Sequence, residues 1–366
     1  MPLSYELASW HGATSGVNAL GWLIYLLSNR LVSDLLLTQG RGEMSRQTDT
    51  IAGAASRATA RIADLVIKTP LRRSAAFSEA SGAEVYLKLE NQQHTGSFKL
   101  RGAANCLLTL TLEQRGKGCV AASSGNHGAA LAYAMRELEV TGVIFVPEQT
   151  SVAKVEAIRR FGGDVQFFGT DGLDTEQYAR KYAAENGMYY VSPYNDADVI
   201  AGQGTCGIEI AEQLSDVDAT FIAVGGGGLI SGVGSVLKMH NPDVRLFGCQ
   251  PKASAVMARS VEAGHILDLP SEPTLSDGTA GGIESDSMTF ELCRELVDEF
   301  ILVTEQEIAA AMRQYVDAER HQIEGAAGVA VAALLSCQDA VKGMKIAVVI
   351  CGGNISEATL NTVLDS

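Results

Sequence analysis

The hydrophobic positions of the chain follow two alternating periods from Glu84 onward. Short runs rich in β-branched and aromatic residues predict strands, and they alternate with segments whose apolar residues recur at helical spacing. The predicted strands are 84–90, 118–124, 142–147, 164–169, 188–193, 219–226, 244–250 and 345–353. The predicted helices are 127–138, 152–161, 174–186, 205–214, 230–240, 305–319 and 325–336. This alternation predicts an α/β protein with mostly parallel sheets, because parallel neighbours need helical crossovers.

The N-terminal region has a different pattern. An apolar run covers residues 17–37, but polar residues interrupt it, and its longest clean stretch is 19–27. A membrane span needs roughly 20 apolar residues. We therefore expect residues 1–43 to be an N-terminal appendage of unknown role and no membrane to be a partner. The globular part is expected to begin near Met44.

Composition narrows the class of partner. The chain has 366 residues, 46% of them hydrophobic, and a formal net charge of −15. Such an acidic protein repels nucleic acid and anionic lipid, which leaves a small molecule as the expected partner. The seven cysteines contain no C-x-x-C pair. Scattered thiols of this kind are typical of a reducing compartment, so a cytoplasmic location is expected.

Three glycine-rich segments follow predicted strands, where open α/β sheets bind their ligands. "VGGGGLISG" (224–232) leads into a helix whose free N–H groups favour a phosphate. Four consecutive glycines cost too much conformational entropy for a tight turn alone, which favours phosphate binding. The segment lacks the Lys-Ser/Thr pair of a P-loop and the spacing of a dinucleotide site, which indicates a monophosphate. "SSGNHG" (123–128) suits a carboxylate or an ordinary helix N-cap, and "CGGN" (351–354) by itself is only a turn.

A single lysine is set in "HTGSFKLRG" (94–102), between a Gly-Ser-Phe turn and a helical run. A lone lysine is usually a surface charge. Together with a phosphate site and a carboxylate site, however, Lys99 suggests pyridoxal 5′-phosphate, which needs a lysine for its Schiff base.

The motifs resemble those of the threonine/serine dehydratases, members of the fold-type II pyridoxal-phosphate enzymes. The resemblance runs in family order from about Arg57 to the C-terminus. It is carried by "KLENQQHTGSFKLRGA", "SSGNHGAALAYA", "VIAGQGT", "VGGGGLISG", "SDGTAGG", "IEGAAGVAVAA" and "CGGN". It implies a fold like that of the tryptophan synthase β subunit, with two open, twisted, mostly parallel α/β domains. The large, cofactor-binding domain is expected at 44–111 and 196–366, and the small mobile domain at 112–195.

The resemblance also implies roles for individual residues. Lys99 is the expected Schiff-base lysine and catalytic base, and Phe98 is expected beside the cofactor ring. Asn126 is expected to bind its 3′-oxygen, and Cys351 to lie next to its pyridine nitrogen. The residues expected to wrap its phosphate are Gly225, Gly226, Gly227, Gly228 and Leu229.

The substrate carboxylate is expected at the "SSGNHG" turn. The residues implied there are Ser123, Ser124, Gly125, Asn126 and His127. Ser124 also occupies the position of the second catalytic group that a racemase needs. For Glu324 of "IEGAAG", a contact with the cofactor-side network and a solvated helix start are both open.

The implied reaction is dehydration and deamination of a 3-hydroxy amino acid such as L-threonine or L-serine, giving a 2-oxo acid and ammonia. Serine racemase, 3-hydroxyaspartate ammonia-lyase and the dehydratase of hydroxyectoine utilization share most of the motifs. A non-catalytic phosphate-ligand sensor is the alternative from another class. The resemblance also implies a homodimer or homotetramer.

The expected site contains no metal. Serine racemases of the eukaryotic type place acidic ligands in the segment matching "CQPKASAVMA" (249–258). Gln250 and Val256 stand at those positions here, and neither side chain suits a hard divalent cation.

Overall fold

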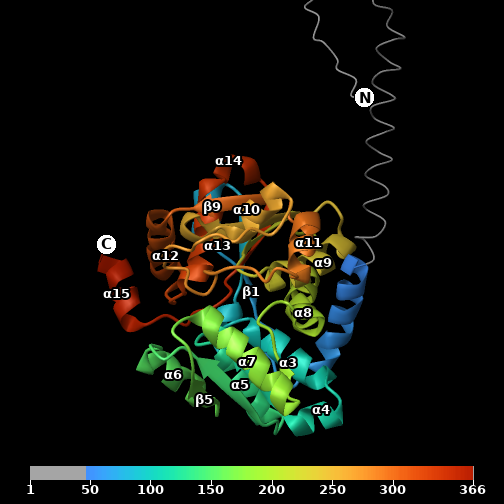
Figure 1. Ribbon diagram of the computed structural model, residues 1–366. Helices are drawn as coiled ribbons and strands as arrows, with labels where there is room; N and C mark the ends of the chain where they lie inside the picture. The colour runs from blue at the N-terminus through green and yellow to red at the C-terminus, as the bar shows by residue number, and fades with distance from the viewer. Residues whose placement is uncertain (1–46, 366) are drawn as a thin grey trace, which may run out of the picture. The chain divides into compact units, whose positions relative to one another are not determined.

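The computed structural model describes residues 47–365 (Figure 1). The expectations for residues 1–43 and for a start at Met44 therefore lie outside the described residues. Between 47 and 365, the alternation of strands and helices forms two separate sheets, each with helices on its faces, as the hydrophobic pattern predicts. The fold is α/β with mostly parallel strands.

The larger sheet has six strands in the order β1-β2-β10-β7-β8-β9. Only β1 is antiparallel, pairing with β2; the other neighbours are parallel, and Val348 of β10, for example, lies opposite Leu87 of β2. The strands are β1 (Leu71–Arg73), β2 (Glu84–Lys88), β7 (Ala219–Ala223), β8 (Arg245–Pro251), β9 (Glu299–Val303) and β10 (Lys345–Val349). Because β2, β10 and β7 are adjacent and parallel, their carboxyl ends meet at one edge of the sheet.

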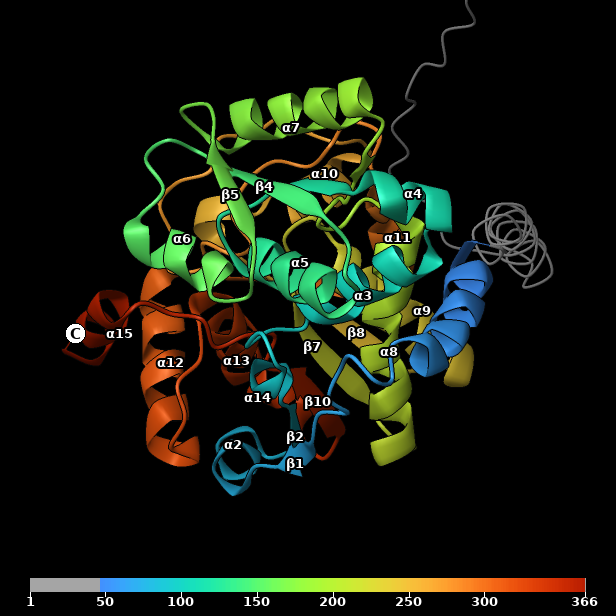
Figure 2. The same ribbon diagram turned by 90° about the horizontal axis from the view of Figure 1, so that it is seen from below.

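The smaller sheet has four strands in the order β5-β4-β3-β6, all parallel. They are β3 (Cys119–Ala122), β4 (Gly142–Val146), β5 (Asp164–Phe167) and β6 (Tyr189–Tyr190). Helix α7 covers one face of this sheet, while α5 and α6 lie on the other (Figure 2). All of its strands come from within the segment 112–195.

The helices of the smaller sheet are α4 (Leu112–Lys117), α5 (Asn126–Glu137), α6 (Val152–Arg159) and α7 (Gly172–Asn186). Those of the rest of the chain are α2 (Ala75–Ser81), α3 (Lys99–Thr109), α8 (Ala197–Gln213), α9 (Gly228–His240), α10 (Val256–Ala263), α11 (Met288–Leu296), α12 (Glu305–Glu319), α13 (Gly325–Ser336), α14 (Gln338–Val341) and α15 (Glu357–Asp365). Residues 47–61 are also helical. None of the described helices is long and apolar enough to cross a membrane.

Helix α13 shows how the sequence builds the core. Its residues are nearly all apolar or glycine, and such a helix is stable only when it is covered on every side. It packs against β7, β8, β9 and β10, and its first ten residues are buried. Figure 2 shows α13 on one side of β7 and β10 and α8 with α9 on the other. The larger sheet is thus buried on both faces, as parallel sheets generally are.

Every predicted strand and helix has a counterpart in the structure, with differences at the ends. Two strands were not predicted: β1 has only three residues, and β9 is partly exposed, so neither has a clear alternation. Helix α8 begins at Ala197, eight residues before the predicted start at 205. The glycines of "VIAGQGTCG" lower its helix propensity, but Asp196 caps it by accepting from the N–H groups of Asp198 and Val199.

Candidate active site

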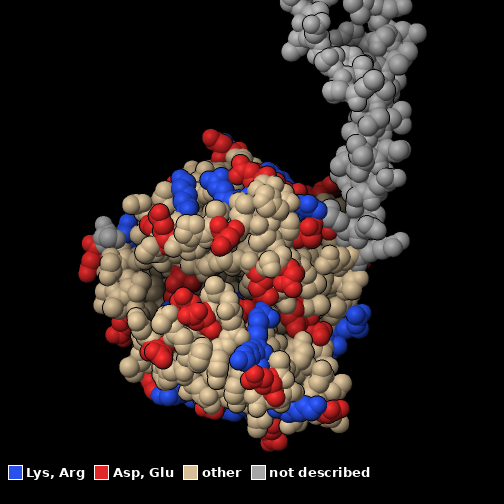
Figure 3. Space-filling model, viewed as in Figure 1, with Lys and Arg blue, Asp and Glu red and all other residues tan. Residues whose placement is uncertain are grey.

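A cavity of about 1220 Å³ lies where the glycine-rich segments meet. It is lined by the turns that follow β3, β7 and β10, together with residues from α6 and the loop 273–279. In Figure 3 the hollow opens on the face shown, between the elements of the larger sheet and those of the smaller one. Parallel sheets place ligands at this position because the strand ends and helix starts converge there.

Lys99 begins α3, and the strand end at Cys351 holds it in place. The N–H of Phe98 donates to the carbonyl of Cys351 at 3.0 Å, and Ser97 and Gly352 form an antiparallel bridge. The Lys99 amine donates to the carbonyl of Pro193 at 2.8 Å and forms no ion pair with a described residue. Burial lowers the pKa of Lys99 to about 8. About a tenth of such an amine is neutral at pH 7, far more than of an ordinary lysine, and the neutral form is nucleophilic and basic.

The glycine loop joins β7 to α9 and forms one wall of the cavity. Gly227 has a φ of 85°, a left-handed conformation that glycine adopts without strain. A Cβ on Gly226 would lie 2.4 Å from the ring of Tyr194, so no larger residue fits there. Gly227 is also the N-cap of α9, and no side chain caps that end. The first N–H groups of α9 are therefore free for an anionic group in the cavity.

The "SSGNHG" turn makes a second helix start beside the cavity. Gly125 is the N-cap of α5, and no side chain caps the first N–H groups of that helix. The N–H of Gly125 itself donates to the Ser123 hydroxyl at 3.3 Å. His127 is buried, and burial lowers its pKa to about 3, so the ring is neutral. Its Nε2 lies 2.9 Å from Val191 O, an acceptor, and so carries the proton. The ring is held in the interior, and α5 offers the cavity its backbone donors.

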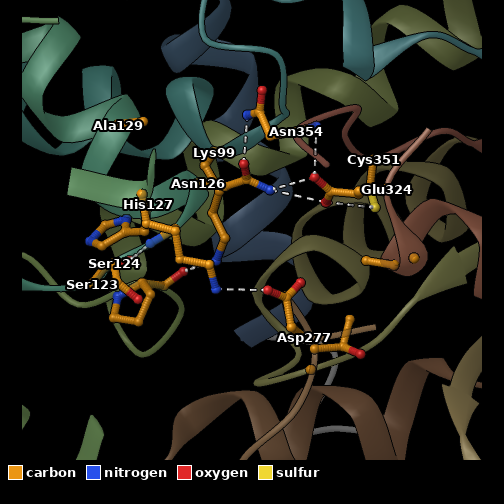
Figure 4. Close-up of a pocket in the computed structure, with 18 of the residues that line it drawn as sticks. Lys99, Ser123, Ser124, Asn126, His127, Ala129, Asp277, Glu324, Cys351 and Asn354 are labelled. Carbon is orange, nitrogen blue, oxygen red and sulfur yellow. Dashed lines mark hydrogen bonds and ion pairs between the residues drawn. The ribbon is translucent and has the colours of Figure 1, made fainter. Parts of the chain in front are cut away.

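A buried carboxylate, Glu324, lies opposite Lys99 (Figure 4). The Asn126 side-chain amide donates to its two oxygens at 3.0 and 2.9 Å, and Asn354 N donates to Oε2 at 3.2 Å. The Asn354 side chain donates in turn to Asn126 Oδ1 at 2.7 Å. Burial raises the pKa of Glu324 to about 7, because these neutral amides only partly offset the loss of solvent. Glu324 is therefore not a solvated helix start, and its contact with the cofactor-side network stays a prediction.

Cys351 completes this side of the cavity. It is buried, and its sulfur lies 4.0 Å from Glu324 Oε1. Burial and the neighbouring carboxylate raise the pKa of its thiol well above the ordinary value. The group is therefore an uncharged thiol.

The comparisons with known proteins agree with this geometry. Residues 62–352 match the model of the family described as "Pyridoxal-phosphate dependent enzyme". The chain belongs to this family. The cofactor of the family is the one that the lysine, the glycine loop and the second helix start suggest.

Relatives in this family are 32–40% identical to the chain over the aligned residues. A putative threonine dehydratase of Sinorhizobium fredii is 40% identical over 300 residues, 82% of this chain and 90% of the relative. An L-threonine ammonia-lyase of Thermotoga maritima is 40% identical over 302 residues, 82% of this chain and 75% of the relative. The structure of threonine deaminase isoform 2 from Solanum lycopersicum has a TM-score of 0.82 and 34% identity, covering 87% of this chain and 93% of that one. The structure of maize serine racemase has a TM-score of 0.81 and 32% identity, covering 86% of this chain and 96% of that one.

In this pyridoxal-phosphate enzyme the sequence-predicted residues come together. Lys99, Phe98, Ser123 to His127, Gly225 to Leu229 and Cys351 all line the one cavity. Three further groups were missed. Pro193 accepts from Lys99, the Tyr194 ring covers the glycine loop, and Asn354 joins Asn126 to the carboxylate. Asn354 stands in "CGGN" and could have been found there. Nothing in the sequence marks the other two, because they act through a carbonyl and a ring face.

Proposed function

We propose that the protein is an ammonia-lyase that eliminates water from a 3-hydroxy amino acid such as L-threonine or L-serine, and that hydrolysis of the resulting enamine gives a 2-oxo acid and ammonia. The observation that carries the proposal is the position of Lys99. A buried amine with a lowered pKa, which forms no ion pair with the residues 47–365, lies in a cavity that also holds two helix starts without side-chain caps. A phosphate sensor would have no need of such an amine.

The residues of the cavity fit pyridoxal 5′-phosphate. The glycine loop and the start of α9 would hold its phosphate, Lys99 its aldehyde carbon and Asn126 its ring oxygen. Cys351 would lie by its ring nitrogen, where a neutral thiol does not enforce ring protonation as a carboxylate would. When bound, the cofactor supplies the electron sink that makes the Cα–H of a linked amino acid acidic.

The chain's own groups carry out the proton transfers. The amine of Lys99 takes the proton from Cα, and its pKa of about 8 keeps enough of it neutral to act as a base. The first N–H groups of α5 and the hydroxyl of Ser124 orient the substrate carboxylate. The bonds that break are Cα–H and Cβ–O, and the hydroxyl leaves as water with the proton that Cα gives to Lys99. Water then hydrolyses the released enamine to the 2-oxo acid and ammonia.

The segment 112–195 is proposed to move as a small domain that closes over the substrate. Two ion pairs support this, since each joins this segment to a loop of the remaining chain. Lys154 of α6 lies 2.9 Å from Asp277, and Arg180 of α7 lies 2.8 Å from Glu284. Closure would exclude water from the reacting atoms. Figure 4 shows Asp277 at the edge of the cavity.

The surroundings of the enzyme are proposed from its charges and thiols. All seven cysteines are free, and burial raises the pKa of every one, so a reducing compartment such as the cytoplasm suits them. On the face in Figure 3, Lys and Arg are scattered among Asp and Glu. We propose a small-molecule substrate, with homodimer or homotetramer assembly.

The test is product formation by the purified, cofactor-loaded protein. We expect 2-oxo acid and ammonia in equal amounts from L-threonine or L-serine, and sodium borohydride should attach the cofactor to Lys99. L-threonine, L-serine and 3-hydroxyaspartate are compared at equal concentration, and D-serine is measured by chiral chromatography. Faster turnover of 3-hydroxyaspartate, or more D-serine than 2-oxo acid, would replace the proposal by the corresponding alternative. No turnover of any 3-hydroxy amino acid would overturn it.

A further inference from the structure

Directly behind Lys99 lies a cluster of four buried charges, here named the ion cluster: Lys88, Glu90, Arg101 and Glu209. Lys88, Glu90 and Arg101 are completely buried, and Glu209 is 6% exposed. With two cations and two carboxylates, the ion cluster is neutral as a whole. None of its members lines the cavity, so the proposed reaction leaves it unexplained.

Arg101 is the centre of the ion cluster. Its Nε and Nη2 donate to the two oxygens of Glu90 at 2.8 Å each, and Nη1 and Nη2 donate to Glu209 at 2.7 and 2.8 Å. Lys88 shares Glu209, and Thr205 accepts from Nη1 at 3.1 Å. A planar guanidinium that forms two forked pairs is fixed in position and rotation. Three parts of the chain meet on it: the end of β2, the start of α3 and the middle of α8.

Arg101 follows Lys99 by two residues on the same helix. Successive residues of an α-helix are about 100° apart, so the two side chains leave α3 on nearly opposite sides. Lys99 faces the cavity and Arg101 faces the interior. A rotation or shift of α3 that moved the amine of Lys99 would therefore break the forked pairs of Arg101.

Close backbone contacts hold α8 between the two helices that start at the cavity. A Cβ on Gly202 would lie 2.4 Å from Arg101 O and 2.7 Å from Gly102 Cα, so α8 touches α3 directly. On its other side, a Cβ on Gly232 of α9 would lie 2.6 Å from Gly204 N. Helix α3 begins with Lys99 and α9 begins at the glycine loop. Helix α8 therefore sets the spacing between the amine and the loop.

We propose that Arg101 and Glu209 are positioning residues that hold Lys99 at its working distance from the glycine loop, through α8. The proposal rests on the proposed function for the meaning of that distance. It also gives a role to the "VIAGQGT" motif, whose glycines make the contacts with α3 and α9. The ion cluster acts through Lys99 and touches neither substrate nor cofactor.

The test uses Glu209→Gln and Arg101→Lys in the cofactor-loaded protein. Glu209→Gln keeps the shape and loses one charge, and Arg101→Lys keeps the charge and loses the forks. Because small displacements of reacting groups are costly, we expect kcat to fall about 10-fold or more in each, with KM changed less. The rate at which borohydride fixes the cofactor on Lys99, followed by mass spectrometry of its peptide, should change as well.

Val341→Ala is the matched control. Val341 is completely buried and lies before the amino end of β10, away from the cavity. The Val341→Ala substitution should lower the melting temperature and leave kcat and the rate of cofactor fixation within twofold of those of the parent. If Glu209→Gln behaved like this control, the ion cluster would only stabilise the fold and the proposal would be wrong. Should Arg101→Lys not fold, Gly202→Ala replaces it, with the same expected loss of kcat.

The two proposals fail in different ways. A protein that fixes the cofactor on Lys99 but releases no 2-oxo acid contradicts the proposed reaction, and the fixation rates of the variants still decide the role of Arg101 and Glu209. Normal turnover with unchanged fixation in both variants contradicts the positioning role alone.

Discussion

Buried charges have opposite surroundings in the interior and in the cavity, although Arg101 and Lys99, which face these two regions, are only two residues apart on α3. In the interior, Arg101 is paired on both sides by carboxylates. Burial alone raises the pKa of Glu90, but the charge and hydrogen bonds of Arg101 outweigh it, and the pKa lies below its ordinary value. In the cavity, Lys99 and Glu324 have mainly neutral partners, and burial moves the pKa of each toward neutrality.

This difference separates charges that stabilise the fold from charges kept for chemistry. A paired buried ion keeps its protonation state throughout the physiological range, so it can orient but cannot transfer a proton. An unpaired buried ion weakens the folded state and is ready to change its protonation state near neutral pH. Substitutions in the two regions should therefore change stability in opposite directions.

The largest effect is expected for Lys99→Met. Activity should fall by at least the roughly 10²- to 10⁴-fold that a positioned proton-transfer group supplies. In the cofactor-free protein, however, the melting temperature should rise at pH 7. The pKa of Lys99 is about 8 when folded and 10.5 ordinarily, so the unfolded state binds more protons between these values. The penalty of the buried charge is therefore complete below pH 8 and is lost as the pH rises to 10.5, where the two proteins should melt together.

The matched variant in the interior is Lys88→Met. It removes a completely buried cation that is paired with Glu209. Unfolding by denaturant should show a loss of roughly 3 kcal/mol, the lower end for one partner of a buried ion pair, because Glu209 keeps its hydrogen bonds with Arg101. Equal stability changes in Lys99→Met and Lys88→Met would contradict the difference between a paired and an unpaired buried cation.

The sequence predicts the cavity wall better than it predicts this division of charges. Its strand ends and glycine turns locate Lys99, the "SSGNHG" turn and the glycine loop, because each is a local pattern with a local structural cause. The ion cluster joins residues as far apart as Lys88 and Glu209. Nothing local shows that "KLE" and "IEI" carry buried charges. Burial and pairing of charges are tertiary properties, so they become visible only with the fold.

A smaller effect is expected for Glu324→Gln. The pKa of Glu324 is about 7 when folded and 4.5 ordinarily, so the folded state binds more protons between these values and parent stability falls from pH 4.5 to 7. The variant should lack this decline. Gln also offers one acceptor where Asn126 and Asn354 now use two, so kcat should fall several-fold and its pH profile should lose a limb near pH 7. Melting curves and initial rates from pH 4.5 to 9 test both points. A decline of the same slope in the variant would assign it to other groups.

The smallest effect is expected for removal of metal ions. The residue that decides this expectation is Gln250, a buried neutral amide. Gln250 is 1% exposed, its amide nitrogen donates to Val224 O at 3.0 Å, and its oxygen accepts from Ala258 N at 2.8 Å. It thus joins the strand end before the glycine loop to α10 with hydrogen bonds alone.

Among residues 47–365 no group of three or more His, Cys, Asp or Glu could hold a metal ion. Metal independence stays a prediction: chelation with EDTA should change turnover less than about twofold, since a Gln and Val256 suit a hard cation poorly. If EDTA abolished activity and Mg²⁺ or Ca²⁺ restored it, the enzyme would need a cation, and the prediction of metal independence would be wrong. Gln250→Leu gives the matching control, because removing both bonds of the amide should loosen the glycine loop and weaken cofactor binding with or without EDTA.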